Sequence, residues 1–263
     1  MNRSAGIALG LAAGAAAGAA VAAVGATGSS SRPESPARRA LAPPAAQALA
    51  IPSPRRLDDG PQLTRWTVVR RAVVARSAPG RRARRVVRIA RRTPEGTPTA
   101  LPVNARQTGR DGRLWLRVTL PVLPNGTRGW IPRRAVGAFE VSRHRLVVDL
   151  AARRLTLLRR GRVLMRAPVG IGRDRWPTPR GTFLVRNRLT RYASPAYGPV
   201  AFGTSARSPT LTDWPAGGFI GIHGTNRPEL LPGKVSHGCV RLRNTDILRV
   251  ARLMPVGTPV EIR

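Results

Sequence analysis

The sequence is poor in several residue types, and each shortage narrows what the protein can be. Among 263 residues there is one cysteine, Cys239, which excludes an intrachain disulfide. The chain also lacks an HExxH motif and the second cysteine that a Cys-rich zinc site requires. Acidic residues number 12 against 46 basic ones, and Lys234 is the single lysine. The protein is therefore rich in arginine, and its one thiol serves a purpose other than cross-linking.

The first residues have the composition of an export signal. Arg3 precedes an uncharged run of Ala and Gly that extends from residue 5 to residue 26. Because this run approaches the ~20 apolar residues that span a bilayer, we predict a signal peptide or an N-terminal membrane anchor over residues 1–28. Residues 29–62 are rich in Pro, Ala and Arg without periodicity, which predicts a linker. Both alternatives place the rest of the chain outside the cytoplasm, in the cell wall or an equivalent periplasmic space, secreted or anchored.

The formal net charge of +34 predicts anionic partners. Nucleic acid is not expected, because an exported chain has little access to it and the basic residues are not interleaved with aromatic residues that could stack on bases. Anionic wall polymers and the membrane surface are better candidates. The alternative is that the arginines, with the many Ala, Gly and Pro residues, reflect a GC-rich genome and no selected partner. The sequence makes no prediction of oligomeric state.

The segment from Ile222 to Leu242 gathers the only cysteine and two of the three histidines. A cysteine attacks carbonyl carbon as a thiolate, which a nearby imidazole can generate. Gly238, directly before Cys239, has no Cβ, so a substrate carbonyl can approach the backbone there and adjacent N–H groups can stabilise an oxyanion. His223 and His237 are the candidate bases. Together these residues predict a site for acyl transfer.

These residues have two other interpretations. A lone cysteine is commonly a small buried core residue, but Ser236, His237, Gly238 and Arg241 make polar surroundings that are unusual for a core position. A catalytic zinc ion needs only three ligands, and His223, His237 and Cys239 supply three suitable groups. Their spacing matches known zinc motifs only loosely, so no metal is expected.

The segment resembles the catalytic signature of the L,D-transpeptidases (YkuD-like). In that signature an HGT-type histidine is followed by Ser/Thr-His-Gly-Cys, an apolar residue, and Arg or Asn. This chain has His223-Gly224-Thr225-Asn226 and then Ser236-His237-Gly238-Cys239-Val240-Arg241. The stretches WPTPRGTF (176–183) and YGPVAFGTSA (197–206) resemble further parts of the same family. The likeness covers residues 140–263.

The resemblance implies a role for each matching residue. Cys239 is the nucleophile and His223 the general base, whose tautomer is fixed by the Gly224 carbonyl. The backbone N–H groups of Gly238 and Cys239 stabilise the oxyanion. Four residues have supporting roles: His237, Ser236, Gly224 and Arg241. Of these, Arg241 orients the substrate or braces the loop. No cofactor or metal is implied.

Short apolar runs between Gly, Asn and Pro signals predict strands along both halves of the chain. Residues 63–139 resemble a bacterial SH3-like wall module, with Trp115 and Trp130 as core or groove residues. Residues 140–263 are predicted as the β-rich catalytic domain. Its one clear helix has Asn244 as N-cap, and its apolar face comprises Ile247, Leu248, Val250, Ala251 and Leu253. The predicted fold is mainly β, a small SH3-like barrel followed by a β-rich L,D-transpeptidase domain with one or two short helices.

The expected function is a peptidoglycan L,D-transpeptidase of cell wall biogenesis, with stem peptides as partners. The cysteine forms a thioester with one stem, and an amine of a neighbouring stem resolves it. Two alternatives remain open. Water resolves the same thioester in an L,D-carboxypeptidase, and a non-catalytic wall-binding protein would retain only the affinity for the wall.

Overall fold

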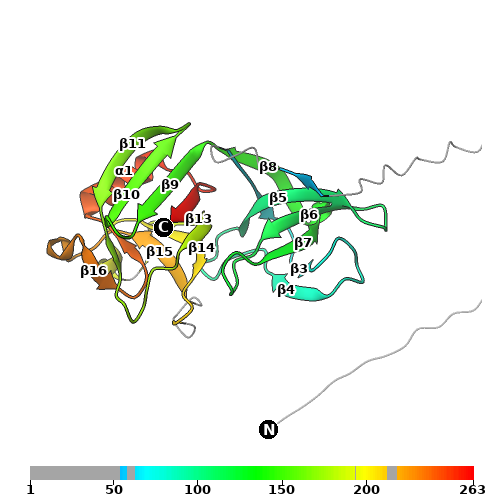
Figure 1. The fold of residues 1–263 in the computed structure, drawn as a ribbon, viewed down its shortest axis with the longest axis horizontal. Coiled ribbons are helices and arrows are strands. Elements are labelled where there is room, and N and C mark those ends of the chain that lie inside the picture. The colour runs from blue at the N-terminus through cyan, green and yellow to red at the C-terminus, as the bar shows by residue number, and fades with distance from the viewer. Residues whose placement is uncertain (1–53, 58–62, 193, 212–217) are drawn as a thin grey trace, which may run out of the picture. The chain divides into compact units, whose positions relative to one another are not determined.

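A computed structural model describes residues 54–57, 63–192, 194–211 and 218–263 (Figure 1). The predicted signal or anchor over residues 1–28 lies outside the described residues, as does most of the predicted linker. Of that linker the strand Arg55–Arg56 is described, and it pairs with a strand further along the chain. None of the described helices is long and apolar enough to cross a membrane. The described residues all belong to one compact unit.

The first half of the described chain forms an antiparallel sheet of eight strands. Their order is β4-β3-β7-β6-β5-β2-β8, with β1 paired to β5. The strands are β1 (Arg55–Arg56), β2 (Thr64–Val69), β3 (Val73–Arg76), β4 (Arg85–Ile89), β5 (Ala100–Thr108), β6 (Leu114–Thr119), β7 (Arg128–Pro132) and β8 (Val136–Ser142). A one-turn 3-10 helix, Arg133–Ala135, connects β7 to β8.

The core of this sheet is aliphatic. Leu101, Leu116 and Ile131 are fully buried within it. Trp115 and Trp130 are also buried, at 2% and 6% exposure, and pack together with Ala105. Of the two roles predicted for these tryptophans, the structure supports the core and not the groove.

The second half forms a mixed sheet of ten strands in the order β11-β10-β9-β18-β13-β14-β15-β17-β12-β16. The strands are β9 (His144–Asp149), β10 (Arg154–Arg159), β11 (Arg162–Pro168), β12 (Gly170–Gly172), β13 (Gly181–Leu189), β14 (Ala201–Arg207), β15 (Phe219–His223), β16 (Gly233–Ser236), β17 (Val240–Arg241) and β18 (Pro259–Ile262). Two more 3-10 turns are Pro195–Tyr197 and Pro228–Leu230.

Sequence patterns explain how these strands pack. In β10, Leu155 and Leu157 are fully buried and their neighbours are not, which is the alternation of a strand with one face in the core. In β13 all five residues from Phe183 to Asn187 are buried, because this central strand is covered on both faces. The final strand, β18, lies between β9 and β13.

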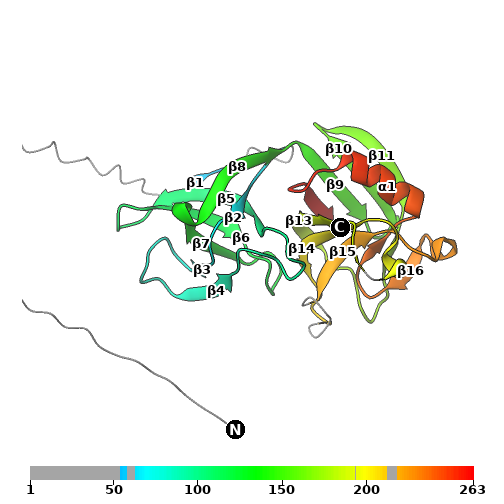
Figure 2. The ribbon, with the colours of Figure 1, turned by 180° about the vertical axis from the view of Figure 1, so that it is seen from behind.

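The predicted helix is present as α1 (Asn244–Leu253), and Figure 2 shows it against the second sheet. Its buried residues, Ile247, Val250 and Ala251, have the i, i+3, i+4 spacing of one helix face. Two details of the prediction are wrong. Leu248 is 40% exposed, because it lies off this face. The N-cap is Arg243, and the Asn244 side chain instead accepts a hydrogen bond from the Thr225 backbone N–H at 3.0 Å.

The fold is thus mainly β with one α-helix among the described residues, as the sequence predicts. The predicted strands of the second half are all present. Strand β14, most of which lies in the stretch 197–206, pairs with both β13 and β15. It therefore joins β15, the strand that ends at His223, to the rest of the sheet.

Candidate active site

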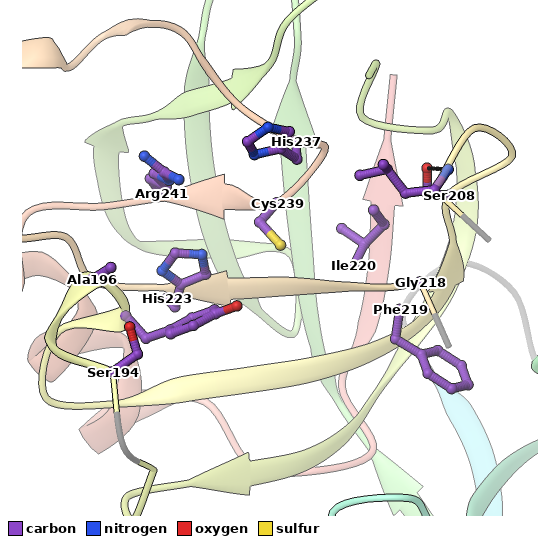
Figure 3. Close-up of a pocket in the computed structure, with 12 residues that line it drawn as sticks. Ser194, Ala196, Ser208, Gly218, Phe219, Ile220, His223, His237, Cys239 and Arg241 are labelled. Atoms are coloured by element: carbon purple, nitrogen blue, oxygen red, sulfur yellow. Dashed lines mark hydrogen bonds between the residues drawn. The ribbon is translucent and has the colours of Figure 1, made fainter. Parts of the chain in front are cut away.

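Cys239 lies in the short turn between β16 and β17, and its sulfur points toward strand β15 (Figure 3). Gly238 makes this turn possible. Its φ of +112° is unfavourable for residues with a side chain, and a Cβ there would lie 2.9 Å from Ile220 Cδ1. The glycine predicted from the motif is therefore required by the backbone geometry.

Two buried hydroxyl groups hold the turn in place. Ser236 Oγ accepts a hydrogen bond from the Gly238 N–H at 3.0 Å and donates one to the Cys239 carbonyl at 2.6 Å. Thr178 Oγ1 donates to the Gly238 carbonyl at 2.8 Å and accepts from the Gly172 N–H at 2.9 Å. Gly238 and the carbonyl of Cys239 are thus fixed by hydrogen bonds outside strand pairing.

This network affects the oxyanion donors that were predicted. The Gly238 N–H is engaged by Ser236, so its donation to an oxyanion would require that bond to be shared or exchanged. The Cys239 N–H has no hydrogen-bond partner among the described residues. Of the two predicted donors, the Cys239 N–H is the one available to a substrate.

The Cys239 sulfur accepts a hydrogen bond from the Gly221 N–H at 3.3 Å. The residue is half-buried, and removal from water raises the pKa of its thiol above the ordinary value. The Gly221 bond and the charge of Arg241 oppose this shift and lower the pKa. Burial dominates, so the resting sulfur carries its proton.

His223 ends strand β15 and is 2% exposed. Its Nδ1 lies 2.6 Å from the Gly224 carbonyl, which can only accept, so Nδ1 carries the hydrogen and Nε2 is free to accept a proton. Burial lowers its pKa to about 4; the Gly224 bond opposes this shift and the charge of Arg241 adds to it. The imidazole is therefore neutral at pH 7. The Tyr197 ring packs against it, with centroids 4.5 Å apart.

Strand pairing brings the thiol and the imidazole together. Strands β15 and β17 run parallel, with His223 opposite Arg241 and Ile222 opposite Val240. A Cβ built on Gly221 would lie 3.7 Å from Cys239 Sγ and 3.6 Å from His223 Cδ2. Both side chains therefore approach the same point. No hydrogen bond joins them among the described residues, and such contacts commonly tighten only when substrate binds.

His237 and Arg241 occupy other parts of the site. The His237 ring packs on Trp176 with centroids 4.3 Å apart, and the Arg175 guanidinium lies 5.0 Å from the Trp176 ring. Arg241 Nε is buried and has no hydrogen-bond partner among the described residues. Within the described parts of the chain, no group of three or more His, Cys, Asp or Glu residues has the arrangement of a metal site.

Two cavities meet at the nucleophile. The first, of about 310 Å³, is lined by His237 and Arg241 on one side and by Ser208 and Gly218 on the other (Figure 3). The second, of about 170 Å³, is lined by residues of β13 and β14, among them Arg186, and by Glu95 from the connection between β4 and β5. Both cavities share the same five residues: Tyr197, Phe219, Ile220, His223 and Cys239.

Several residues of the site were not assigned a role from the sequence. Thr178 lies in the quoted stretch 176–183, but nothing there indicates that its hydroxyl fixes a turn 60 residues later. Gly221 acts through its backbone N–H, and Tyr197 through the packing of its ring on His223. Neither contact produces a recognisable residue spacing in the sequence. Glu95 comes from the other sheet. The structure brings the motif residues Cys239, His223, Gly224 and Ser236 together in one region.

Comparison with known proteins agrees with this geometry. Residues 143–262 match the YkuD family model, the L,D-transpeptidase catalytic domain, so that catalytic domain is present in this chain. Relatives include the proteins named L,D-transpeptidase YkuD from Bacillus licheniformis and Bacillus subtilis. They are 35% and 33% identical over 119 residues, which is 45% of this chain. The chain spans 65% of the length of each of these relatives.

The chain also has partial likenesses to solved structures, each with a TM-score below 0.5. Bd1075 of Bdellovibrio bacteriovorus is 29% identical, with a TM-score of 0.38 over 46% of this chain and 47% of that one. An L,D-transpeptidase from Mycobacterium smegmatis is 18% identical, with a TM-score of 0.37 over 57% of this chain and 90% of that one.

Proposed function

We propose that this protein is a peptidoglycan L,D-transpeptidase that joins stem peptides through a thioester on Cys239. The observation that carries the proposal is the approach of the Cys239 sulfur and the His223 imidazole to the same point beside Gly221. These residues lie within the match to the L,D-transpeptidase catalytic domain, and the relatives bear the name of the same activity. The substrate class is the stem peptide of peptidoglycan.

Acylation begins with both groups neutral. Because the His223 pKa is about 4 and burial raises the Cys239 pKa, a thiol faces an unprotonated imidazole at pH 7. The imidazole removes the thiol proton as the sulfur attacks the carbonyl carbon of the stem, a general-base step. The C–S bond forms, and negative charge develops on the carbonyl oxygen near the Cys239 N–H.

Collapse of the oxyanion completes the transfer. The C–N bond breaks, the leaving D-amino acid takes the proton from the His223 imidazolium, and the thioester remains on the enzyme. An amine of a second stem then attacks the thioester, forming a C–N bond and breaking the C–S bond. The amine loses a proton and the sulfur regains one, so the enzyme returns to its starting state without a cofactor.

The remaining motif residues have supporting roles in this proposal. Ser236 holds the turn through the Gly238 N–H and the Cys239 carbonyl, and the Gly224 carbonyl orients His223. Arg241 lines the first cavity, where its charge suits the carboxylate of a stem peptide. His237 also lines the first cavity.

The wider setting is also part of the proposal. We infer export to the cell wall or an equivalent periplasmic space from residues 1–28, with the chain secreted or anchored. We also infer that residues 63–139, whose strands form an antiparallel sheet, serve as an SH3-like wall module. The high positive charge of the chain suits anionic wall polymers or the membrane surface.

The test is incubation of the full-length protein with tetrapeptide muropeptides, followed by mass spectrometry. A transpeptidase releases D-alanine and yields cross-linked dimers. A carboxypeptidase releases D-alanine and yields tripeptides only, which would redirect the proposal to hydrolysis. If neither product forms, the protein binds the wall without catalysis, although intact Cys239 and His223 argue against that result.

A further inference from the structure

The second cavity beside the nucleophile contains one acidic side chain among the described residues that line it, Glu95. No acidic side chain is found among the described residues of the first cavity. Glu95 belongs to the connection between β4 and β5, in the first sheet, whereas every other described residue of this cavity lies in the second half of the chain. The first sheet therefore supplies a charged group to a cavity that also contains Cys239 and His223.

A tight turn presents Glu95. The Thr93 N–H donates to the Thr97 carbonyl at 2.7 Å, and the Gly96 N–H donates to the Thr93 carbonyl at 2.9 Å. The hydroxyls of Thr93 and Thr97 are 2.8 Å apart and share a hydrogen bond. Gly96 has a φ of +79°, which favours glycine. The position of Glu95 is thus built into the turn.

Glu95 is also held from the second sheet. Its Oε1 forms an ion pair with Arg186, whose side chain is 5% exposed. Its Oε2 accepts a hydrogen bond from Asn187 Nδ2 at 3.2 Å, and the same amide group donates to Thr97 Oγ1 at 3.0 Å. A carboxylate has about four acceptor positions, so these two donors leave capacity for a ligand. The Glu95 side chain keeps 19% of its surface exposed.

The two cavities differ in their acidic side chains: the described lining of the first has none, whereas the second contains Glu95 together with its ion-pair partner Arg186. This difference matches the two substrates of a transpeptidase. The first contains Arg241, which suits the carboxylate of the donor stem. The acceptor must bring an amine, which is mostly an ammonium ion at neutral pH. In a protein of net charge +34, an ammonium ion is repelled unless a local carboxylate receives it.

We propose that the second cavity binds the acceptor and that Glu95 is a specificity-determining residue that holds the acceptor's ammonium group. This inference rests on the proposed transpeptidase function. The ammonium gives one proton to solvent, its nitrogen then attacks the thioester carbon, and the C–S bond breaks. The second proton passes to the departing sulfur. Glu95 concentrates and orients the amine but takes no part in these transfers, and it biases the thioester toward amine over water.

The experiment measures the ratio of cross-linked to hydrolysed product in the full-length protein. Glu95→Gln keeps the shape and removes the charge, and Glu95→Asp keeps the charge on a shorter side chain. Glu140→Gln is the matched control, because Glu140 is exposed on β8 of the same sheet and lines neither cavity. We expect the ratio to fall at least about tenfold in Glu95→Gln, with the KM for acceptor rising more than that for donor, and to recover partly in Glu95→Asp. A ratio in Glu95→Gln equal to that of the control overturns the inference.

A second measurement uses the unaltered protein, in case loss of the Arg186 partner prevents folding. Acceptor stems are prepared with the amine either N,N-dimethylated or N-acetylated. Neither forms an amide product, but only the dimethylated amine carries a proton and a positive charge. We expect the dimethylated stem to compete with acceptor at least about tenfold more strongly than the acetylated stem. Equal competition by both overturns the inference. Formation of cross-linked dimers by the unaltered protein distinguishes these outcomes from failure of the transpeptidase proposal itself.

Discussion

The hydroxyl of Thr178 donates a hydrogen bond to the carbonyl of Gly238, the residue directly before the nucleophile, at 2.8 Å. The same hydroxyl accepts a hydrogen bond from the Gly172 N–H, so it connects the turn that contains Cys239 to strand β12. The position of the sulfur therefore depends on a side chain that touches neither the thiol nor the imidazole.

Replacing this hydroxyl tests the relationship. Thr178→Val leaves the buried Gly172 N–H and Gly238 carbonyl without their partner, so we expect a loss of stability of about 1–3 kcal/mol and a lower kcat. Thr182→Val is the control, since Thr182 is exposed on β13. Thermal unfolding and D-alanine release are measured on both. Equal behaviour of the two variants would show that the turn holds its shape without Thr178.

The nucleophile is tested by Cys239→Ala, which we expect to lose transfer and hydrolysis by about 10³-fold or more and to remain folded. Cys239→Ser should be nearly as inactive, because a hydroxyl is far less acidic than a thiol. Product formation is followed by mass spectrometry, and the fold by circular dichroism. Normal turnover in the alanine variant would end the assignment.

The two histidines are expected to differ. His223→Ala removes the base and should lower the rate by about 10²- to 10⁴-fold, whereas His237→Ala removes a ring that packs on Trp176 and should cost less. Both variants and the unaltered protein are assayed with and without a chelator. Loss of activity on chelation, restored by zinc alone, would revive the metal interpretation.

The pKa values predict the shape of the pH profile. Acylation needs a neutral imidazole, so kcat/KM should fall as the pH drops through about 4 and stay level at neutral pH. Protonation of His223 also favours the unfolded chain, because its ordinary pKa of 6.5 is higher than its folded value. Stability should therefore decline as the pH falls from about 6.5 toward 4, and unfolding is measured at each pH. A profile that instead falls near 6.5 with the fold intact would contradict the buried, neutral imidazole.

An arginine cluster on the first sheet is the place to test binding to the wall. Arg113, with Arg71 and Arg81, lowers the pKa of Arg134, which indicates that the four charges lie near one another. Changing these four to Gln should weaken retention on sacculi at 0.1 M salt, where the Debye length is about 10 Å. The control changes four exposed arginines of the second sheet: Arg154, Arg159, Arg162 and Arg166. Equal losses would mean that retention follows total charge and not this cluster.

The sequence indicates the candidate catalytic residues more readily than the residues that hold or flank them. Cys239 and His223 could be proposed because both lie in one short motif, and the strands because short apolar runs are bounded by Gly, Asn and Pro residues. Thr178 and Glu95 could not be found in this way, since each acts across a separation of 60 residues or more that only the folded sheets close. Asn244 was misassigned for a related reason: its amide oxygen bonds to Thr225, a tertiary contact that replaced the expected local cap.

The place of β18 in the sheet has a consequence for synthesis. This strand lies between β9 and β13, so the sheet is divided in two until residues 259–262 have been made and have emerged. Those residues follow the nucleophile by 20 positions. A growing chain can thus expose its thiol before the complete sheet that positions it has formed. A chain that ends before Pro259 would contain the whole motif but lack the strand that joins β9 to β13.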